Sequence, residues 1–537
     1  MQEHYESLGR NAANYVALTP LSFLARTADL FPEREAVIYG ALRLSWGDVQ
    51  RRANRLASAL IKRGVEVGDT VAVLSPNTPA MFDAHFGVPL AGAVLNTINF
   101  RLEASTIAYI LDHGDAKVLL TDTAFASTVR NALSQIKSDV LVVDIDDPEG
   151  PGGEKLGQIE YEQLLEEGDE QFEGVYPGDE WQALALNYTS GTSGRPKGVV
   201  YHHRGAYLMS MGTVTAWGLT QHPRYLYSVP MFHCNGWGHA WTMALLAGTV
   251  ILMRDVTAAK VFNAVADHSV THFGGAPIVL SMLVDAPSSE RREFNHDVQV
   301  MTAGAPPPPV VLEKTRALGF NVMQVYGLTE TFGHVTQCLW REEWDDESSG
   351  RQAEIKSWQG VAFPMTEQVG IVDLDSDELL PRDGTAEGEI VLRGNTVMKG
   401  YYKDPAATAA AFKNGWFRSG DAAVWRQNGY MQIRDRLKDV IISGGENISS
   451  VEVEGVLYRH EAVAAAAVVA MPHEKWGEVP CAFVELKPGC SALESDIIAF
   501  CREHLAGFKT PKRVEFGELP KTATGKIQKF LLRQKIR

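Results

Sequence analysis

The sequence predicts an α/β protein with more than one domain. Its 537 residues exceed what a single hydrophobic core usually organises. Hydrophobic residues make up 45% of the chain and charged residues 22%, which is typical of folded globular domains. Short apolar runs alternate with stretches whose apolar residues recur at helical spacing, and this alternation predicts layers of strands and helices.

The first region supplies a helix, three strands and a loop. Residues 48–64 have apolar residues at helical spacing and end at a glycine, as helices often do. Residues 69–77, 116–122 and 138–146 are short apolar runs that predict buried strands. Residues 147–157, "DPEGPGGEKLG", are polar and rich in Gly and Pro, so we expect a surface loop there.

The second region repeats the pattern of a short apolar run followed by a turn. The runs are 224–233, 248–255, 270–277, 298–309 and 321–330. Each ends in small or polar residues. Because ligands bind at the carboxyl ends of the strands in open α/β sheets, these turns are candidate site residues as a group.

The last region is rich in predicted strands and contains a domain boundary. Residues 387–405 and 415–449 alternate apolar runs with Gly and Asn turns, and serines at 449–450 favour the start of a helix. Residues 461–486 predict a strand, a turn and a strand, and a helix is expected near Glu494 to His504, followed by a basic tail.

We place the boundary at "RDRLKD", which divides the chain into residues 1–436 and 437–537. The second part, at about 100 residues, has the size of a typical domain.

Charge and cysteine content restrict the partners and the compartment. The net charge of −16 argues against a nucleic-acid partner. The five scattered cysteines lack CxxC spacing, which favours reduced thiols over disulfides or zinc. Without a signal peptide, a membrane span, or a peroxisomal or ER-retention address at "LLRQKIR", we expect a cytoplasmic protein. A homodimer is the expected oligomeric state on general frequency.

The stretch "NYTSGTSGRPKGV", residues 187–199, has the composition of a phosphate-binding loop. Its glycines permit close approach to the backbone, its hydroxyls donate hydrogen bonds, and Lys197 adds a positive charge after the stiffening Pro196. The spacing differs from that of a Walker A loop. Taken alone, the stretch is also compatible with a flexible polar surface loop.

Seven motifs in a fixed order resemble those of the adenylate-forming superfamily, which contains acyl-CoA synthetases, amino-acid adenylation domains and beetle luciferases. They are "YTSGTSGRPKGV", "MFHCNGWG", "TAGAPP", "YGLTE", "SGD", "RDRLKDVIISGGENIS" and "PKTATGKIQK". The resemblance implies a large N-terminal domain of layered α/β subdomains and a small, mobile α+β C-terminal domain. It also implies ATP, Mg²⁺ and CoA as participants. A carboxylate attacks the α-phosphate of ATP to give an acyl-adenylate and pyrophosphate, and CoA then takes the acyl group and releases AMP.

The resemblance assigns the nucleotide to residues of several motifs. Tyr326 would stack on adenine, Thr329 would contact the α-phosphate, and Glu330 would bind Mg²⁺. Asp421 would accept hydrogen bonds from both ribose hydroxyls, with Arg436 in support. A plain ion pair is the alternative role for Arg436. The full ATP and AMP set is Thr189, Ser190, Gly191, Thr192, Ser193, Gly194, Lys197, Gly304, Ala305, Pro306, Tyr326, Gly327, Thr329, Asp421 and Arg436.

Lys526 is the residue that the resemblance identifies as the adenylation lysine. The substrate carboxylate and the α-phosphate repel each other, and an ammonium that touches both lowers this barrier. Taken alone, a lysine in a basic tail would be solvated surface. His233 is expected to border the carboxylate, and a role as general base stays open. The catalytic set is thus Lys526, Thr329, Glu330 and His233.

The remaining motif residues are assigned to the acyl group, CoA and the hinge. The acyl pocket is expected to contain His233, Trp237, Trp241, Gly304, Phe332, Gly333 and His334. CoA is expected at Gly444, Gly445, Glu446 and Trp476, and the hinge at Lys438. His268 and His272 lack the glutamate of an HExxH metal motif and are interpreted as structural.

The bulky aromatic residues predict a short pocket without a charged partner for a substrate amine. The chain looks most like the branch of plant acyl-activating enzymes and bacterial 3-methylmercaptopropionyl-CoA ligases. We therefore expect 3-methylmercaptopropionate or another short- or medium-chain acid, with an aromatic acid such as benzoate or cinnamate as the alternative. His334 departs from the proline of many relatives.

Two other functions stay open at this point. One is an adenylate-forming enzyme with another acceptor, such as a carrier protein or oxygen. The absence of a following carrier segment disfavours a modular peptide synthetase. The other is a catalytically silent protein that kept the fold, which the intact Lys526, Glu330 and Asp421 disfavour. The chain contains neither a G-x-S-x-G elbow nor a G-x-G-x-x-G fingerprint.

Overall fold

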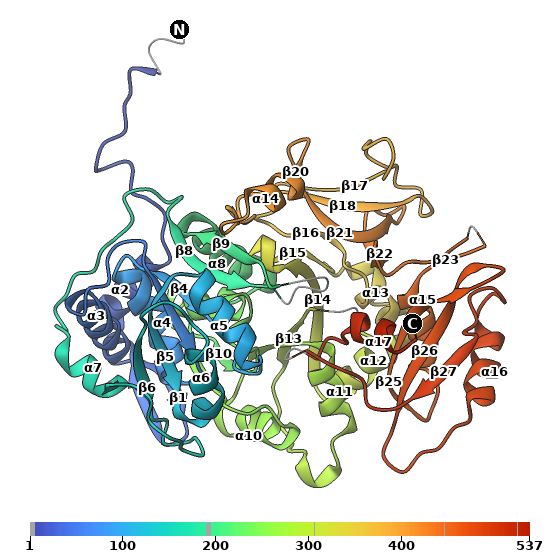
Figure 1. The fold of residues 1–537 in the computed structure, drawn as a ribbon, viewed down its shortest axis with the longest axis horizontal. Coiled ribbons are helices and arrows are strands. Elements are labelled where there is room, and N and C mark those ends of the chain that lie inside the picture. The colour runs from blue at the N-terminus through green and yellow to red at the C-terminus, as the bar shows by residue number, and fades with distance from the viewer. Residues whose placement is uncertain (1–5, 190–194, 305–306, 445, 523–524, 537) are drawn as a thin grey trace.

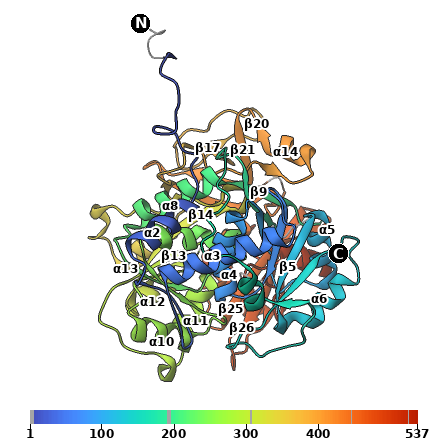
Figure 2. The same ribbon diagram turned by 90° about the vertical axis from the view of Figure 1, so that its left-hand side faces the viewer.

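The computed structural model describes residues 6–189, 195–304, 307–444, 446–522 and 525–536. Its α/β architecture, with two large sheets, a smaller third sheet and a separate C-terminal sheet, confirms the predicted fold class (Figure 1). Figure 2 shows the same layers from the side, with α3 (Trp46–Lys62) and α4 (Pro79–Leu90) crossing the body of the molecule. None of the described helices is long and apolar enough to cross a membrane.

The first large sheet carries the strand that leads into the Thr/Ser/Gly loop. Its central strands are parallel, and all five residues of β3 are buried, as expected for a strand covered on both faces. The strand order is β19 (Gly400–Tyr401), β9 (Gly198–His202), β8 (Ala183–Tyr188), β4 (Val94–Thr97), β3 (Thr70–Leu74), β5 (Ala116–Asp122), β6 (Leu141–Ile145) and β7 (Ile159–Glu160). The helices between these strands, besides α3 and α4, are α5 (Ala104–His113), α6 (Ala126–Leu133) and α7 (Tyr161–Glu167).

The second large sheet carries most of the other motif turns. Its order is β16 (Val361–Ala362), β15 (Gly333–Gln337), β14 (Phe320–Leu328), β13 (Val298–Thr302), β12 (His272–Gly275), β10 (Arg224–Tyr227), β11 (Thr249–Leu252), β1 (Glu35–Tyr39) and β2 (Leu42–Ser45). Its associated helices are α2 (Leu21–Leu30), α8 (His203–Trp217), α9 (His239–Leu245), α10 (Ala258–His268), α11 (Pro277–Asp285), α12 (Pro309–Ala317) and α13 (Ser349–Lys356).

One apolar core is shared by both large sheets and by α2, α3, α4, α8 and α9. The predicted helix at 48–64 is α3, which begins two residues earlier than expected. It begins there because Ser45 and Asp48 form a capping box, in which Ser45 accepts from the Asp48 N–H and Asp48 accepts from the Ser45 N–H.

A buried charge cluster also joins the two large sheets. Arg254, which follows β11, donates to Asp122 at the end of β5 with two nitrogens, at 2.7 and 3.0 Å, and to Asp147 at 2.5 Å. The Tyr39 hydroxyl of β1 donates to the same Asp147 oxygen. The three charged side chains are between 1% and 9% exposed, so each charge depends on its partners.

The third sheet and the C-terminal domain meet at the predicted boundary. The third sheet contains β17 (Gln368–Val372), β18 (Glu387–Arg393), β21 (Trp416–Trp425), β20 (Phe412–Lys413) and β22 (Met431–Arg436), with α14 (Pro405–Ala411) beside it. The C-terminal sheet contains β24 (Glu446–Ile448), β23 (Ile441–Ser443), β26 (Gly477–Leu486), β25 (Val463–His473) and β27 (Arg513–Phe516). Its helices are α15 (Ser450–Leu457), α16 (Glu494–His504) and α17 (Lys529–Lys535).

The C-terminal sheet packs its own apolar clusters, and the chain enters it between Arg436 and Ile441. The boundary that we propose at 436/437 lies in this interval. Side chains on both sides of it are in contact, because Asp435 accepts from the backbone N–H and the hydroxyl of Ser450, at 2.6 and 2.5 Å. Within the C-terminal part, Arg533 of α17 pairs with Asp439.

Candidate active site

The motif residues lie at the carboxyl ends of strands, as expected for an open α/β sheet. Thr189 follows β8, Gly304 follows β13 closely, and Thr329 follows β14 directly. Thr189 and Lys197 close the ends of the loop between them through a backbone hydrogen bond of 3.0 Å. The predicted site residues Ser190, Gly191, Thr192, Ser193, Gly194, Ala305, Pro306 and Gly445 lie outside the described residues, so their roles stay predictions.

Asp421 is the centre of a buried hydrogen-bonded group. It is 4% exposed, its Oδ2 accepts from the Tyr326 hydroxyl at 2.8 Å, and its Oδ1 lies 3.2 Å from Nε of Arg436. Asp421 and Arg436 are register partners of β21 and β22. Burial is the largest single influence on Arg436 and disfavours its charge, but Asp421 and the other nearby acidic groups together outweigh burial, so the pKa of Arg436 is raised. The arrangement fixes an acceptor-only carboxylate with lone pairs left for further donors.

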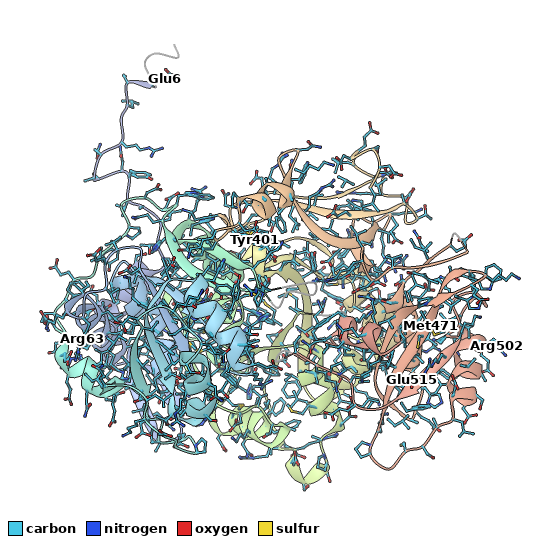
Figure 3. The ribbon with its side chains drawn as sticks, viewed as in Figure 1. Glu6, Arg63, Tyr401, Met471, Arg502 and Glu515 are labelled. Atoms are coloured by element: carbon cyan, nitrogen blue, oxygen red, sulfur yellow. The ribbon has the colours of Figure 1, made fainter. Side chains whose placement is uncertain are left out.

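Glu330 lies in a second polar group, formed by three distant segments. The Tyr401 hydroxyl donates to Glu330 Oε1 at 2.9 Å, and the ammonium of Lys197 lies 4.7 Å from the centroid of the Tyr401 ring. Tyr401 is labelled near the middle of the molecule in Figure 3. The carboxylate of Glu330 and the charge of Lys197 therefore both contact the same tyrosine.

Thr329 connects the "YGLTE" turn to the "FHCNGWG" turn. The Tyr201 hydroxyl donates to the Thr329 carbonyl at 2.6 Å, and the Cys234 thiol lies 3.5 Å from the Thr329 hydroxyl. Burial raises the pKa of the Cys234 thiol to about 11, so this thiol is protonated at neutral pH. The thiol acts here as a packed neighbour of Thr329.

Residues 233–238 form an unusual turn. Residues 234–238 have positive φ angles of 44°, 41°, 56°, 59° and 71°, so five consecutive residues are left-handed. They are Cys234, Asn235, Gly236, Trp237 and Gly238. Left-handed backbone costs roughly 1–2 kcal/mol per non-glycine residue. Such strain persists only where the surroundings hold it, and it is concentrated at functional sites. One of the contacts that hold this turn is the Tyr227 hydroxyl, which donates to the Gly236 carbonyl at 2.9 Å.

Lys526 lies near the Asp421 group, because its charge interacts with those of Arg436 and Asp421. Its side chain is exposed, yet neighbouring protein atoms desolvate its ammonium. This desolvation, aided by the charge of Arg436, lowers the pKa of Lys526 to about 8. Asp421 and Asp439 oppose the shift. Gly525 has φ +80°, and a Cβ there would lie 2.5 Å from Cγ2 of Ile278, so the backbone beside Lys526 approaches α11 closely.

His233 is near enough to Lys526 for the lysine charge to act on its imidazole. Burial, together with the nearby Lys526 charge, lowers the pKa of His233 to about 4. The imidazole is therefore neutral at physiological pH and does not repel the lysine. A neutral imidazole can accept a proton, but nothing in the chain-internal contacts of His233 assigns it a base role.

The lowered pKa predicts a pH dependence. If Lys526 balances the two anions, as the resemblance implies, it must be protonated to do so. We then expect kcat/KM for the acid to fall as pH rises through about 8, where a lysine with the usual pKa of 10.5 would stay charged. Because His233 is neutral over this range, kcat/KM should not change with pH between pH 5 and 7. A pH profile of kcat/KM measures both. Lys526→Arg should be slower but should lose the alkaline limb, since arginine stays charged. If the limb persists in Lys526→Arg, another group titrates.

The predicted acyl side contains rings in mutual contact. The ring centroid of Trp237 lies 5.2 Å from that of His334 and 5.9 Å from that of His239. The Nδ1 of His239 is bonded to the Tyr225 hydroxyl at 2.6 Å, whereas Nε2 of both histidines is buried without a partner among the described residues. Burial lowers the pKa of His334 to about 3, so this wall is neutral and aromatic.

The other predicted pocket residues have distinct positions. Phe332 is buried against Tyr201, with ring centroids 4.0 Å apart, and Trp241 is fully buried in the core. A Cβ built on Gly304 would meet open space. A Cβ on Gly327 would lie 1.5 Å from the Gly333 carbonyl, so Gly327 is explained by the close approach of β15. His272 contacts Trp217 and Thr271, which agrees with a structural role.

The predicted CoA and hinge residues lie in the C-terminal domain and at its entry. The Gly444 N–H donates to the Trp476 carbonyl at 2.8 Å, and the Trp476 ring is 45% exposed beside the ammonium of Lys475. Glu446 is exposed on β24. Lys438 lies between β22 and β23, and burial, with help from Arg436, lowers its pKa. An exposed ring and a cation beside a glycine turn suit a nucleotide surface, and the CoA role stays a prediction.

Sequence reasoning missed several residues of this site. Tyr401, Asn187, Asn235 and Tyr227 make the contacts that orient motif side chains, and Ile278 contacts the Lys526 loop. The signal for Asn235 was present, because Asn is the residue that tolerates left-handed backbone best after Gly. The others depend on contacts between residues far apart in the chain.

Comparison with known proteins identifies the family. The model of the AMP-binding enzyme family matches residues 24–402, and that of the AMP-binding enzyme C-terminal domain matches residues 452–526. Acetate–CoA ligase CCL3 from Humulus lupulus is 49% identical over 99% of this chain and 96% of its own. The peroxisomal acetate/butyrate–CoA ligase AAE7 from Arabidopsis thaliana is 48% identical over 99% and 96%. The peroxisomal trans-cinnamate:CoA ligase from Petunia hybrida is 44% identical over 98% and 96%.

A solved structure agrees with these relatives. ATP-bound MatB from Rhodopseudomonas palustris superimposes with a TM-score of 0.82 at 25% identity, covering 96% of this chain and 98% of its own. The chain therefore belongs to the AMP-binding enzyme family, and it is an AMP-forming acid–CoA ligase.

The site also fits a magnesium ion that is held mainly by ATP. The described residues contain no group of three His, Cys, Asp or Glu side chains that could hold a metal by themselves. Mg²⁺ usually takes one or two carboxylates and completes its shell with phosphate oxygens and water. Glu330, whose carboxylate is oriented by Tyr401, offers one such ligand on the phosphate side.

Proposed function

We propose that this ligase activates short-chain carboxylic acids, with acetate, butyrate and similarly compact alkyl acids as its substrates. The observation that carries the proposal is the neutral wall of Trp237 and His334, whose ring centroids are 5.2 Å apart. Both rings are buried, so the wall leaves little depth for a long chain. The names of the Humulus and Arabidopsis relatives support acids of this size.

In the first step, the carboxylate of the acid attacks the α-phosphorus of ATP and displaces pyrophosphate. Lys526 would contact both anions and stabilise the charge that they share. Asp421, oriented by Tyr326 and Arg436, would accept hydrogen bonds from the ribose hydroxyls. Glu330 would hold Mg²⁺ against the phosphates, and this ion would neutralise charge on the leaving pyrophosphate.

In the second step, the thiol of CoA attacks the acyl carbon of the adenylate and AMP leaves. We propose that CoA approaches past Gly444 and stacks its base near the exposed Trp476, beside Lys475. Rotation of residues 437–537 about Lys438 would bring this surface to the adenylate. The homodimer and the cytoplasmic location stay predictions, and two of the relatives carry the word peroxisomal in their names.

Two further acids have specific support. The thioether acid 3-methylmercaptopropionate would bring its sulfur to the rings of Trp237 and His334, and contacts between sulfur and aromatic rings are favourable by about 0.3–1.5 kcal/mol. Cinnamate is the substrate in the name of the Petunia relative. Either acid would keep the mechanism and change only the acyl group.

A substrate panel tests the proposal. We expect kcat/KM for CoA-dependent thioester formation to be highest among acetate, propanoate, butyrate and 2-methylpropanoate. Each added methylene that the pocket cannot hold should cost about 10–200-fold. Octanoate and cinnamate should therefore be the poorest acids of the panel, and a preference for cinnamate would contradict the proposal. A maximum at 3-methylmercaptopropionate would support the thioether acid instead.

A further inference from the structure

The left-handed turn at 234–238 is tied to the first large sheet by a buried carboxamide. Asn235 is fully buried, and its Oδ1 accepts from Nδ2 of Asn187 at 2.6 Å. Its Nδ2 donates to the Thr97 hydroxyl at 3.2 Å, and that hydroxyl lies 3.1 Å from the Phe232 carbonyl, to which it donates. The carboxamide of Asn235 thus contacts the ends of both β8 and β4.

These contacts join the two halves of the site. Asn187 lies at the end of β8, two residues before Thr189, where the predicted phosphate loop begins. Asn235 lies two residues after His233 and two before Trp237, in the turn that follows β10 of the other large sheet. The bond between Asn187 and Asn235 is therefore a direct link between the strand that carries the nucleotide loop and the turn that carries the acid-side residues.

The backbone of the turn makes this link necessary. Three of its five left-handed residues are not glycine, so the conformation depends on contacts from outside the turn. Asn235, at the second position, supplies two of them with its side chain. Without that carboxamide the turn is free to relax, and the relaxation would move His233 and Trp237 relative to the phosphate loop.

We propose that Asn187, Asn235 and Thr97 are positioning residues that set the distance between the substrate carboxylate and the α-phosphate. The inference rests on the proposed function, since it concerns the same acid and nucleotide. In-line attack tolerates little displacement, and a misplacement of about 1 Å can cost on the order of 100-fold in rate. The three residues are between 0% and 4% exposed, so we expect them to act through the turn and the phosphate loop and not by touching a reacting atom.

Two substitutions separate the side chain from the backbone. Asn235→Gly keeps left-handed backbone at no steric cost but removes the carboxamide. Asn235→Ala removes the carboxamide and also introduces a residue that tolerates left-handed backbone poorly. Asn187→Ala removes the partner from the other sheet. Asn54→Ala is the matched control, because Asn54 is also a buried asparagine that donates to a carbonyl, that of Glu170 at 2.9 Å, in α3 far from the motif turns.

The readout is pyrophosphate release at varied acid and at varied ATP, together with the melting temperature of each variant. In Asn235→Gly and Asn187→Ala we expect kcat/KM for the acid to fall by about 10–100-fold while KM for ATP changes less than about twofold. In Asn235→Ala, kcat/KM for the acid should fall further. The double variant Asn187→Ala/Asn235→Gly should be no worse than the poorer single variant, because both remove one shared contact. Asn54→Ala should lower only the melting temperature.

Other results would overturn the inference. If the losses in acid turnover match those of Asn54→Ala at equal melting temperature, the network is only structural. Additive losses in the double variant would mean that the two asparagines act separately. A wild-type enzyme that releases no pyrophosphate with any short acid would overturn the proposed function, and the inference with it, whereas an active wild type with unchanged variants overturns the inference alone.

Discussion

Lys526→Ala should lower the rate of acyl-adenylate formation by about 10²–10³-fold, the usual cost of losing one preorganised charge contact to a transition state. The ammonium is near enough to Asp421, Arg436 and His233 for their charges to interact, and we propose that it offsets the repulsion between carboxylate and phosphate. ATP–pyrophosphate exchange with acetate or butyrate measures this step. Transfer to CoA from supplied acyl-adenylate, which requires no attack on phosphorus, should change by less than about tenfold.

The control for this experiment is Lys521→Ala. Lys521 is in the same C-terminal segment, but its ammonium pairs with Glu485 at 2.8 Å and both side chains are more than a quarter exposed. Both half-reactions should be unaffected in Lys521→Ala. An equal loss of both half-reactions in Lys526→Ala would contradict the assigned role and would point to a fold defect or to a role in CoA transfer.

Arg254→Ala should lower the free energy of unfolding of the N-terminal domain by about 3–5 kcal/mol. The substitution leaves Asp122 and Asp147 buried at 1% and 3% side-chain exposure without their cation, and an uncompensated buried charge is costly. Urea denaturation followed by tryptophan fluorescence measures the change as a shift of the midpoint. Arg292→Ala, which breaks an exposed pair with Asp267, should cost only about 0–1 kcal/mol. Equal costs for the two variants would show that the buried cluster adds nothing to stability.

Much of the fold could be predicted because local patterns determine it. The short apolar runs at 70–74, 116–122 and 141–145 are strands, and the helix predicted near Glu494 to His504 is α16 with these bounds. These segments bury most of their apolar residues, so the apolar pattern and the turns around them suffice. Helix α15 begins after its Ser449 cap, where serine was expected to favour a start.

The structure of the basic tail was harder to predict from the sequence, because it depends on contacts with residues outside the tail. Residues predicted only as a tail form α17, a helix too short to be stable alone. Its Leu532 is buried in the C-terminal core, and Lys529 at its start pairs with Glu454 at 2.7 Å. Glu454 lies 75 residues earlier in the chain, so no local pattern could reveal the pair.

In the site, too, local motifs predicted some features, and others depend on contacts between distant residues. The motif order predicted the positions of Lys526, Asp421 and Glu330, since each motif requires its residue types at fixed spacing. The side chains that orient them could not be predicted, because Tyr401 and Asn187 contact residues 71 and 48 positions away. The left-handed turn was equally hidden, since it exists only where those long-range contacts hold it.

The proposal that this enzyme adenylates a short acid before it uses CoA is tested most directly by acid-dependent ATP–pyrophosphate exchange in the absence of CoA, followed by addition of CoA. We expect exchange with short acids before CoA is present, and stoichiometric AMP and acyl-CoA after CoA is added. We also expect Lys526→Ala to abolish most of the exchange. Absence of exchange with every acid, or exchange that is insensitive to Lys526→Ala, would contradict the claim that the site around Lys526 adenylates a short carboxylic acid.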